Sequence, residues 1–420
     1  MEQSTIAAII FLATYAVIVS ERIHRTAAAL AGGLLMILSG VVTQEDAFLA
    51  LDLNVIFLLA GMMIIAHIIS DTGLFQWMAA QAVRLGRGRP VNILIIIALL
   101  TAVTSALLDN VTVVVLIAPV TLYVAASLGV SPIPFLITSV MASNIGGAAT
   151  LIGDPPNILI ASAANIDFNT FLLNMGPVAF VTLTAYVAIM YFQFRGELTV
   201  REDAQKPVRR LEATGLITDR KLLVQSLSVL GLVLVAFLLH ARLHLEPATI
   251  ALGGATLLLI ITGRDPNKVM EHVEWGTLMF FVGLFITVEA VVKVGIIDQI
   301  GQSLLNLTQG NVRITAHLLL WFSAVASGIV DNIPYTATML PLIKSLAGSM
   351  SIEPLWWALA MGADFGGNLT LVGASANVVA ANLAERSGHK ISFAMFLRYG
   401  FITVLISLLL SSLYLELLYV

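Results

Sequence analysis

Cysteine is absent from all 420 residues, so disulfides, thiolate metal sites and cysteine nucleophiles are excluded together. Charged residues supply only 11% of the chain, where a soluble domain usually carries about 25%. Hydrophobic residues supply 59%, and the net charge of −4 gives no reason to expect a nucleic-acid partner. The first residues lack the basic start of a cleavable signal peptide. This composition predicts an all-α polytopic membrane protein.

Apolar runs of about 20 residues, the length that a helix needs to cross a bilayer, recur along the chain. We expect about ten spans, near 4–20, 27–42, 53–70, 132–163, 169–194, 223–240, 247–262, 274–293, 354–384 and 391–419. Two further apolar segments, 91–127 and 314–349, are long enough for two short helices, but each carries an Asp-Asn pair in its middle. We interpret both segments as re-entrant hairpins.

The stretch from Ser143 to Ile160 lies in an apolar region and yet cannot form one continuous helix. Three glycines weaken it, and a Pro-Pro pair removes two backbone donors. Interrupted backbone at membrane depth is tolerated only where it is buried in protein or faces a watery cavity. The pattern therefore predicts a broken helix at 132–163 that forms part of a transporter's binding site.

The two halves of the chain repeat each other. Leu108-Asp109-Asn110 returns 222 residues later as Val330-Asp331-Asn332, and Gly146–Asn157 matches Gly366–Asn377 at six of twelve positions. A second broken helix is therefore expected at 354–384. Five spans per half place the halves upside down relative to each other, an arrangement typical of secondary transporters. We predict repeats at 1–194 and 222–420, joined by a polar linker at 195–221.

Both hairpin tips and both broken helices offer short polar side chains and free backbone groups, which suit a small solute or cation. Ser143, Ser327 and Ser375 belong to these segments. The predicted substrate-binding residues are Ser105, Asn110, Thr112, Asn144, Gly147, Thr150, Asn157, Asn332, Thr336, Asn368, Thr370 and Asn377.

Four carboxylates lie at membrane depth, where a charge costs roughly 2.5–3.5 kcal/mol or more. We predict that Asp109, Asp154, Asp331 and Asp364 carry protons or cations. Helix capping is the alternative for the first three, whereas Asp364 is the favoured carrier because the other half has Asn144 in its place.

Two observations leave alternatives open. His67 and Glu289 occupy matching positions in the third spans, where they belong either to scaffold contacts or to a proton route. The broken helices contain no arginine or lysine, which favours a neutral or cationic substrate over a dianion. Phosphate loops, nucleophile elbows and metal-ligand pairs are missing, so we expect no enzyme, no cofactor and no metal site.

Basic residues predict the orientation. Placing the 195–221 loop in the cytoplasm puts sixteen of the 21 lysines and arginines on that side. Both termini are then external, and the expected location is the inner (plasma) membrane.

The segments 105–112, 143–160 and 331–338 resemble the arsenite permease (ArsB/NhaD-type) family of the ion transporter superfamily, a grouping that includes the P protein and, distantly, the dicarboxylate/sodium symporters. The resemblance covers essentially the whole chain. It implies re-entrant hairpins, elevator-type movement, often a homodimer, and in some members a soluble ATPase partner. In the dicarboxylate branch, paired Ser-Asn-Thr motifs bind substrate; the matching places here read Asp-Asn-Val, Ser-Asn-Ile-Gly, Asp-Asn-Ile and Ala-Asp-Phe-Gly.

The leading functional hypothesis is proton-coupled efflux of arsenite or antimonite. Arsenite at neutral pH is an uncharged triol that amides, hydroxyls and carboxyls can bind without thiolates. A sodium/proton antiporter is the alternative in the same class, followed by an anion or dicarboxylate permease. An ion channel is the alternative from a different class, and paired broken helices argue against it.

Overall fold

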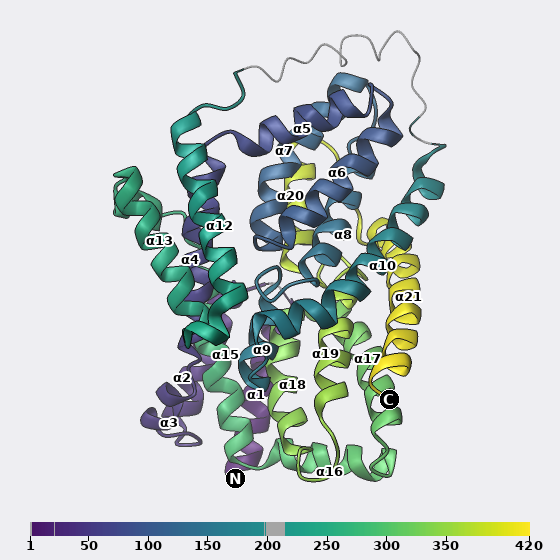
Figure 1. The fold of residues 1–420 in the computed structure, drawn as a ribbon. Helices are drawn as coiled ribbons and strands as arrows, with labels where there is room; N and C mark the ends of the chain where they lie inside the picture. The colour runs from purple at the N-terminus through teal and green to yellow at the C-terminus, as the bar shows by residue number, and fades with distance from the viewer. Residues whose placement is uncertain (1, 21, 197, 199–214) are drawn as a thin grey trace.

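The structure, a computed structural model, describes residues 2–20, 22–196, 198 and 215–420 (Figure 1). The described residues form helices and no strand, which confirms the predicted all-α class. Most of the predicted linker at 195–221 lies outside the described residues.

The helices of the first half are α1 (Gln3–Ser20), α2 (Arg25–Leu38), α3 (Gln44–Leu49), α4 (Leu53–Ser70), α5 (Leu74–Leu85), α6 (Pro90–Ser105), α7 (Asn110–Leu128), α8 (Ile133–Gly147), α9 (Pro155–Ala164) and α10 (Phe168–Phe194). Those of the second half are α12 (Arg220–Leu243), α13 (Pro247–Thr262), α14 (Pro266–Met270), α15 (Trp275–Lys293), α16 (Ile296–Thr308), α17 (Val312–Ile329), α18 (Asn332–Ser345), α19 (Glu353–Gly366), α20 (Ser375–Arg386) and α21 (Phe393–Leu418). Each half of the described chain thus contributes ten helices.

Eight of these helices are long and apolar enough to cross a membrane, namely α1, α4, α7, α10, α12, α15, α17 and α21. The expected spans at 27–42 and 247–262 are shorter apolar helices. The first ends early because the chain turns at Gly40, whose φ of 73° lies in the left-handed region that favours glycine. The helices α7 and α17, predicted as hairpin halves, are long enough to span by themselves.

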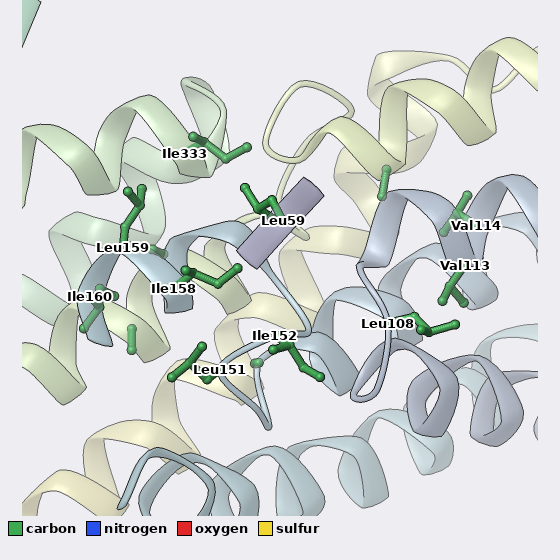
Figure 2. Packing of buried hydrophobic residues seen from close by; sticks show 14 of the residues in the cluster. Leu59, Leu108, Val113, Val114, Leu151, Ile152, Ile158, Leu159, Ile160 and Ile333 are labelled. Atoms are coloured by element: carbon green, nitrogen blue, oxygen red, sulfur yellow. The ribbon is translucent and has the colours of Figure 1, made fainter. Parts of the chain in front are cut away.

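Both predicted broken helices are interrupted where the sequence indicated. The chain leaves helical geometry after Gly147 and resumes it at Pro155, and it does so again between Gly366 and Ser375. Apolar residues of the first break, Leu151 and Ile152, lie in the buried core close to α9 (Figure 2). The breaks are therefore enclosed by protein, as interrupted backbone at membrane depth requires.

Helices of the two halves pack against each other, α2 against α15 and α4 against α13. Glycines permit the close approach. A Cβ on Gly283 would lie 2.3 Å from the carbonyl carbon of Ala29, and one on Gly61 would lie 2.7 Å from that of Ala251. Gly61 and Gly283 are counterparts in the repeat, so both helix crossings depend on a glycine at the same position.

The two helical hairpins enter the molecule from opposite ends. In Figure 1, α5 leads into α6 and α7 at the top of the view, whereas α16 leads into α17 and α18 at the bottom. Their tips and the two breaks consequently meet inside the molecule, and this meeting point is the candidate site.

Candidate functional site

Each hairpin tip is fixed by the aspartate that precedes its second helix. Asp109 Oδ1 accepts a hydrogen bond of 2.9 Å from the backbone N–H of Thr112, at the start of α7. Asp331 Oδ1 accepts one of 3.1 Å from Ile333 at the start of α18. Both side chains thus cap helices, the alternative left open for them. Capping satisfies backbone donors that would otherwise be unpaired.

In the first break, a threonine and an asparagine hold the irregular backbone in place. Thr150 Oγ1 donates to the carbonyl of Ala106 in the first tip at 2.6 Å. Asn157 Nδ2 donates to the carbonyls of Gly147 and Thr150, at 3.2 and 3.0 Å. These bonds replace those that a continuous helix would have supplied.

The second break is held in the same way. Thr370 Oγ1 donates to the carbonyl of Gly328 at 2.6 Å, and Asn377 Nδ2 donates to the carbonyls of Gly367 and Thr370 at 2.7 and 2.8 Å. The positions that recur in the sequence are therefore those that stabilise the breaks. Whether they also bind a substrate stays a prediction.

A chain of amides crosses the centre of the molecule between the two halves. Asn110 Nδ2 donates to Asn144 Oδ1 at 3.2 Å, and Asn144 Nδ2 donates to the Oδ1 atoms of Asn368 and Asn377 at 2.9 and 3.0 Å. All four side chains are buried. The structure thus brings four of the predicted binding residues into one connected network.

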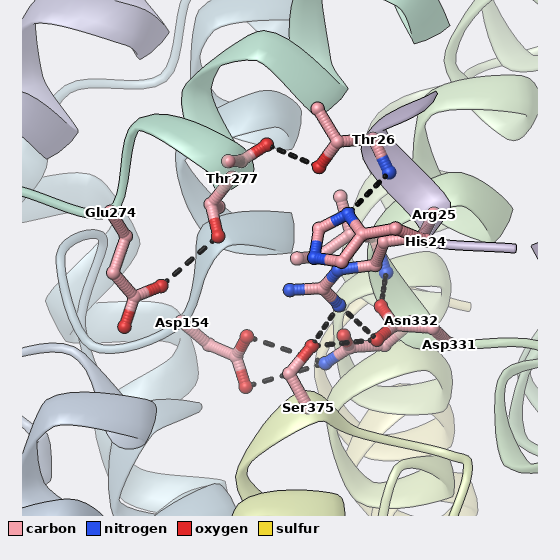
Figure 3. Close-up of polar contacts among 11 residues, drawn as sticks. His24, Arg25, Thr26, Asp154, Glu274, Thr277, Asp331, Asn332 and Ser375 are labelled. Atoms are coloured by element: carbon pink, nitrogen blue, oxygen red, sulfur yellow. Dashed lines mark hydrogen bonds and ion pairs between the residues drawn. The ribbon is translucent and has the colours of Figure 1, made fainter. Parts of the chain in front are cut away.

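Asp154 joins both hairpin tips. Its carboxylate accepts a 2.7 Å hydrogen bond from Asn110 in the first tip and bonds of 3.3 and 3.4 Å from Asn332 in the second (Figure 3). It stands in the N-cap position of α9 but makes no side-chain cap bond. The capping alternative is therefore wrong for Asp154, because its oxygens are turned toward the tip asparagines.

Asp364 lies near the end of α19 and is fully buried. Its carboxyl lies beside the Asn157 side chain, but neither oxygen forms a hydrogen bond of normal geometry with the described residues. Asn157 Oδ1 also has no hydrogen-bond partner among the described residues. The orientation of this amide is fixed, because its Nδ2 donates to two backbone carbonyls. Three acceptor oxygens are thus left without donors in the protein interior, a costly arrangement unless something positive binds there.

The remaining predicted residues surround this centre. Ser143 Oγ donates to Ser105 Oγ at 3.0 Å and lies 3.2 Å from the carbonyl of Asn110, and Ser327 Oγ donates to the carbonyl of Ala363 at 2.7 Å. Thr336 Oγ1 is buried and has no hydrogen-bond partner among the described residues.

The sequence interpretation missed Arg25, which reaches the site from α2. Its guanidinium donates to Asp331 at 3.0 Å and to Ser375 (Figure 3). The predicted broken helices at 132–163 and 354–384 contain no basic residue, but the site does contain one, because the chain places a residue from the start of α2 against the second tip. No local sequence signal distinguished it from other basic residues outside the apolar runs.

Two cavities reach this region. A narrow one is lined by Arg25, Asp109, Asp154, Glu274 and Asn332. A wider one lies between α4, α9 and the α12–α13 turn and reaches Leu151 and Ile158 at the first break.

His67 lies outside the centre, where its ring stacks on His272 at 3.8 Å. Within the described part of the chain, no group of three or more His, Asp or Glu side chains is placed to share a metal ion.

Comparison with known proteins gives the same picture of a membrane transporter. A sequence profile described as citrate transporter (CitMHS) matches residues 15–362. Proteins described as uncharacterized transporters in Mycobacterium bovis and Mycobacterium tuberculosis are 46% identical over 424 residues, covering 99% of both chains.

A more distant relative is the P protein of Sus scrofa, 35% identical over 98% of this chain and 59% of its own length. Among solved structures, the YdaH transporter of Alcanivorax borkumensis aligns over 99% of this chain and 98% of its own, with a TM-score of 0.59 and 16% identity. That likeness supports the fold.

Proposed function

The chain is a membrane transporter of the citrate transporter (CitMHS) family, and from this premise we propose proton-coupled secondary transport of a small solute, arsenite or antimonite, as in the arsenite permease branch. The observation that carries the proposal is the buried Asp364 carboxyl beside Asn157, with no hydrogen bond to the described residues. Such a group must take up a proton or a cation, or face water.

The charges of the site favour a neutral or cationic solute over free citrate. Arg25 is the one basic side chain that lines the narrow cavity within the described part of the chain, and Asp331 already pairs with it. Asp109, Asp154 and Glu274 line the same cavity. A citrate trianion would enter a region with more negative than positive groups, whereas an uncharged triol needs only donors and acceptors.

We further propose that transport proceeds by elevator-type movement between two bodies. The transport body comprises α6–α9 and α17–α20, and the scaffold comprises α1, α2, α4, α12, α13 and α15. The contacts that join the two bodies differ between the two halves. Such a difference is expected when the transport body lies at one end of its movement.

The unequal contacts suggest the size of that movement. Asp52 at the start of α4 accepts a hydrogen bond from Ser162 on α9. The counterparts of this pair are Glu274 and Asn382, but Glu274 accepts its hydrogen bond from Thr277 in its own helix. Glu274 lines the narrow cavity together with Ser375, the first residue of α20, and Asn382 lies seven residues further along that helix, about 10 Å. Sliding the transport body by about this distance would bring Glu274 to Asn382.

Because the chain has no native cysteine, disulfide trapping can test the movement directly. The pair Asp52→Cys with Ser162→Cys should cross-link in the described position. The pair Glu274→Cys with Asn382→Cys should cross-link only in the other position and should stop transport when oxidised. Equal cross-linking of both pairs under all conditions would contradict the elevator proposal.

A substrate panel tests the solute. Expressed in a strain without its own efflux system, the protein should raise arsenite resistance, and Asp364→Asn should abolish the effect. A well-expressed protein that gives no resistance would overturn the arsenite assignment. Citrate-dependent uptake would overturn the charge argument.

Sodium/proton antiport is the second candidate, favoured by the three unpartnered oxygens of Asp364 and Asn157. Alkali cations are bound by oxygen ligands of this kind. Dye-monitored proton movement on adding sodium to everted vesicles distinguishes this activity, since arsenite exchange needs no sodium.

A further inference from the structure

Arg25 bridges the two bodies at the edge of the narrow cavity. Its Nη1 donates to Asp331 Oδ2 at 3.0 Å and also to Ser375 Oγ. Ser375 Oγ in turn donates to Asp331 Oδ2 at 2.7 Å, so the three groups form a closed triangle (Figure 3). The guanidinium carbon lies 5.5 Å from the centroid of the Phe280 ring, a distance at which a cation is attracted to the ring.

The donor and its two acceptors belong to different parts of the molecule. Arg25 begins α2 and Phe280 lies in α15, two packed helices of the scaffold. Asp331 stands at the tip between α17 and α18, and Ser375 begins α20, so both acceptors belong to the transport body. The scaffold therefore supplies the positive charge, and the transport body supplies the oxygens.

Further negative groups surround this triangle. Glu274 at the start of α15, Asp109 in the first tip and Asp154 in the first break line the same cavity as Arg25. Removing the guanidinium would leave Asp331 among these carboxylates with no other basic side chain on the described cavity wall. An uncompensated charge at this depth is costly, so another positive charge has to replace it.

We propose that Asp331 and Ser375 form a site for one positive charge, which the Arg25 guanidinium occupies in the described position as a tethered counter-ion. When the transport body slides away, a proton or a sodium ion takes the place of Nη1 on Asp331 Oδ2. The exchange conserves charge at the tip, because one unit leaves with Arg25 and one arrives with the ion.

This inference rests on the proposed movement and adds a coupling rule to it. An empty transport body is held to the scaffold by the ion pair and stays in place. Arrival of the ion weakens the pair and frees the body, so that movement without an ion is suppressed. Arg25 is on this view a positioning residue that links ion binding to movement.

Thermal unfolding of the purified full chain tests the site without relying on movement. The wild-type midpoint should respond to added sodium or to acidification only through other groups such as Asp364, because Arg25 already fills the Asp331 site. Arg25→Gln keeps a hydrogen-bonding side chain but removes the charge, so its midpoint should rise more than that of wild type with sodium or with falling pH. The Asp331→Asn change in the same background should abolish this additional response.

Arg22→Gln is the matched control, since Arg22 is exposed and lies three residues before Arg25, in the turn that precedes α2. It should behave as wild type. Separate arms, sodium at fixed pH and pH without sodium, identify the ion. If Arg25→Gln responds to neither ion, or if wild type responds equally, the site is not a counter-ion site.

Cross-linking of Glu274→Cys with Asn382→Cys tests the coupling rule. In the wild-type background, the replacing ion should raise the cross-linking rate by about fivefold or more, the usual lower range of coupling between sites. With Arg25→Gln the rate should be high and independent of the ion. If the ion dependence persists in Arg25→Gln, the coupling rule is wrong. If wild type never cross-links, the elevator proposal fails instead, and the thermal result still judges the site.

Discussion

Replacing Asp364 by asparagine should affect stability and transport in opposite directions, because the buried carboxyl is needed for transport but lowers the free energy of unfolding. Asp364 is fully buried, and neither of its oxygens has a hydrogen-bond partner among the described residues. An ionised carboxylate at membrane depth costs roughly 2.5–3.5 kcal/mol. The Asp364→Asn amide avoids this cost and can donate to the unpartnered Oδ1 of Asn157, a hydrogen bond worth about 1 kcal/mol.

We therefore expect Asp364→Asn to unfold with a free energy equal to that of wild type or higher by up to about 3 kcal/mol, while proton-linked transport is lost. Thermal unfolding in detergent and flux in everted vesicles measure the two effects on the same preparation. Asp46→Asn is the matched control, since the Asp46 side chain is 40% exposed and pairs with Lys293; it should retain transport. A lower melting temperature for Asp364→Asn, or retained proton-linked flux, would refute the reasoning.

Three further changes test the architecture of the site. Asp154→Ala leaves the tip asparagines without their shared acceptor, so we expect a loss of about 1–3 kcal/mol in unfolding free energy together with the loss of all transport, measured by melting and by flux. Gly146→Ala places a Cβ 2.1 Å from the carbonyl oxygen of Ala102 and should cost about 1–3 kcal/mol, whereas Gly231→Ala, with no neighbouring atom within 4 Å, should be neutral or stabilising in the same melts. Tyr15→Phe removes a hydroxyl that bonds the second hairpin to the scaffold and should lower stability by about 1 kcal/mol; an unchanged melting curve would show that this contact is not maintained.

The fold was largely predictable because its determinants are local. Glycines weaken a helix and a Pro-Pro pair cannot lie in its interior, so the break after Gly147 follows from backbone chemistry. The Asp-Asn tips follow from the capping preference of aspartate, and the structure places Asp109 and Asp331 as caps. Because the two halves repeat each other, the same predictions apply to the second break and the second tip.

The site was less predictable because it depends on contacts between distant segments. Arg25 and Asp331 are separated by 306 residues, and nothing in the residues around Arg25 indicates where its side chain points. Asp154 illustrates the same limit, since a residue before Pro-Pro is a natural helix cap, yet its carboxylate bonds to the two tips instead. Local sequence therefore predicts where the backbone leaves helical geometry, whereas tertiary packing determines which side chains become partners.

The two halves share the groups that hold the breaks and differ in their acids. Thr150 and Thr370 form equivalent bonds, as do Asn157 and Asn377, because the fold needs each of these groups twice. Asp364 has no such duplicate, since its counterpart is an asparagine amide within the central network.

Asp154 also lacks a duplicate, but its oxygens are satisfied by both tips, so its loss should open the site itself. Asp364 makes no bond to the tips, so a proton or ion bound to it would not compete with the tip asparagines. This difference is why we assign ion coupling to Asp364 and assembly of the site to Asp154, and why only the Asp364 variant should remain fully folded when transport is lost.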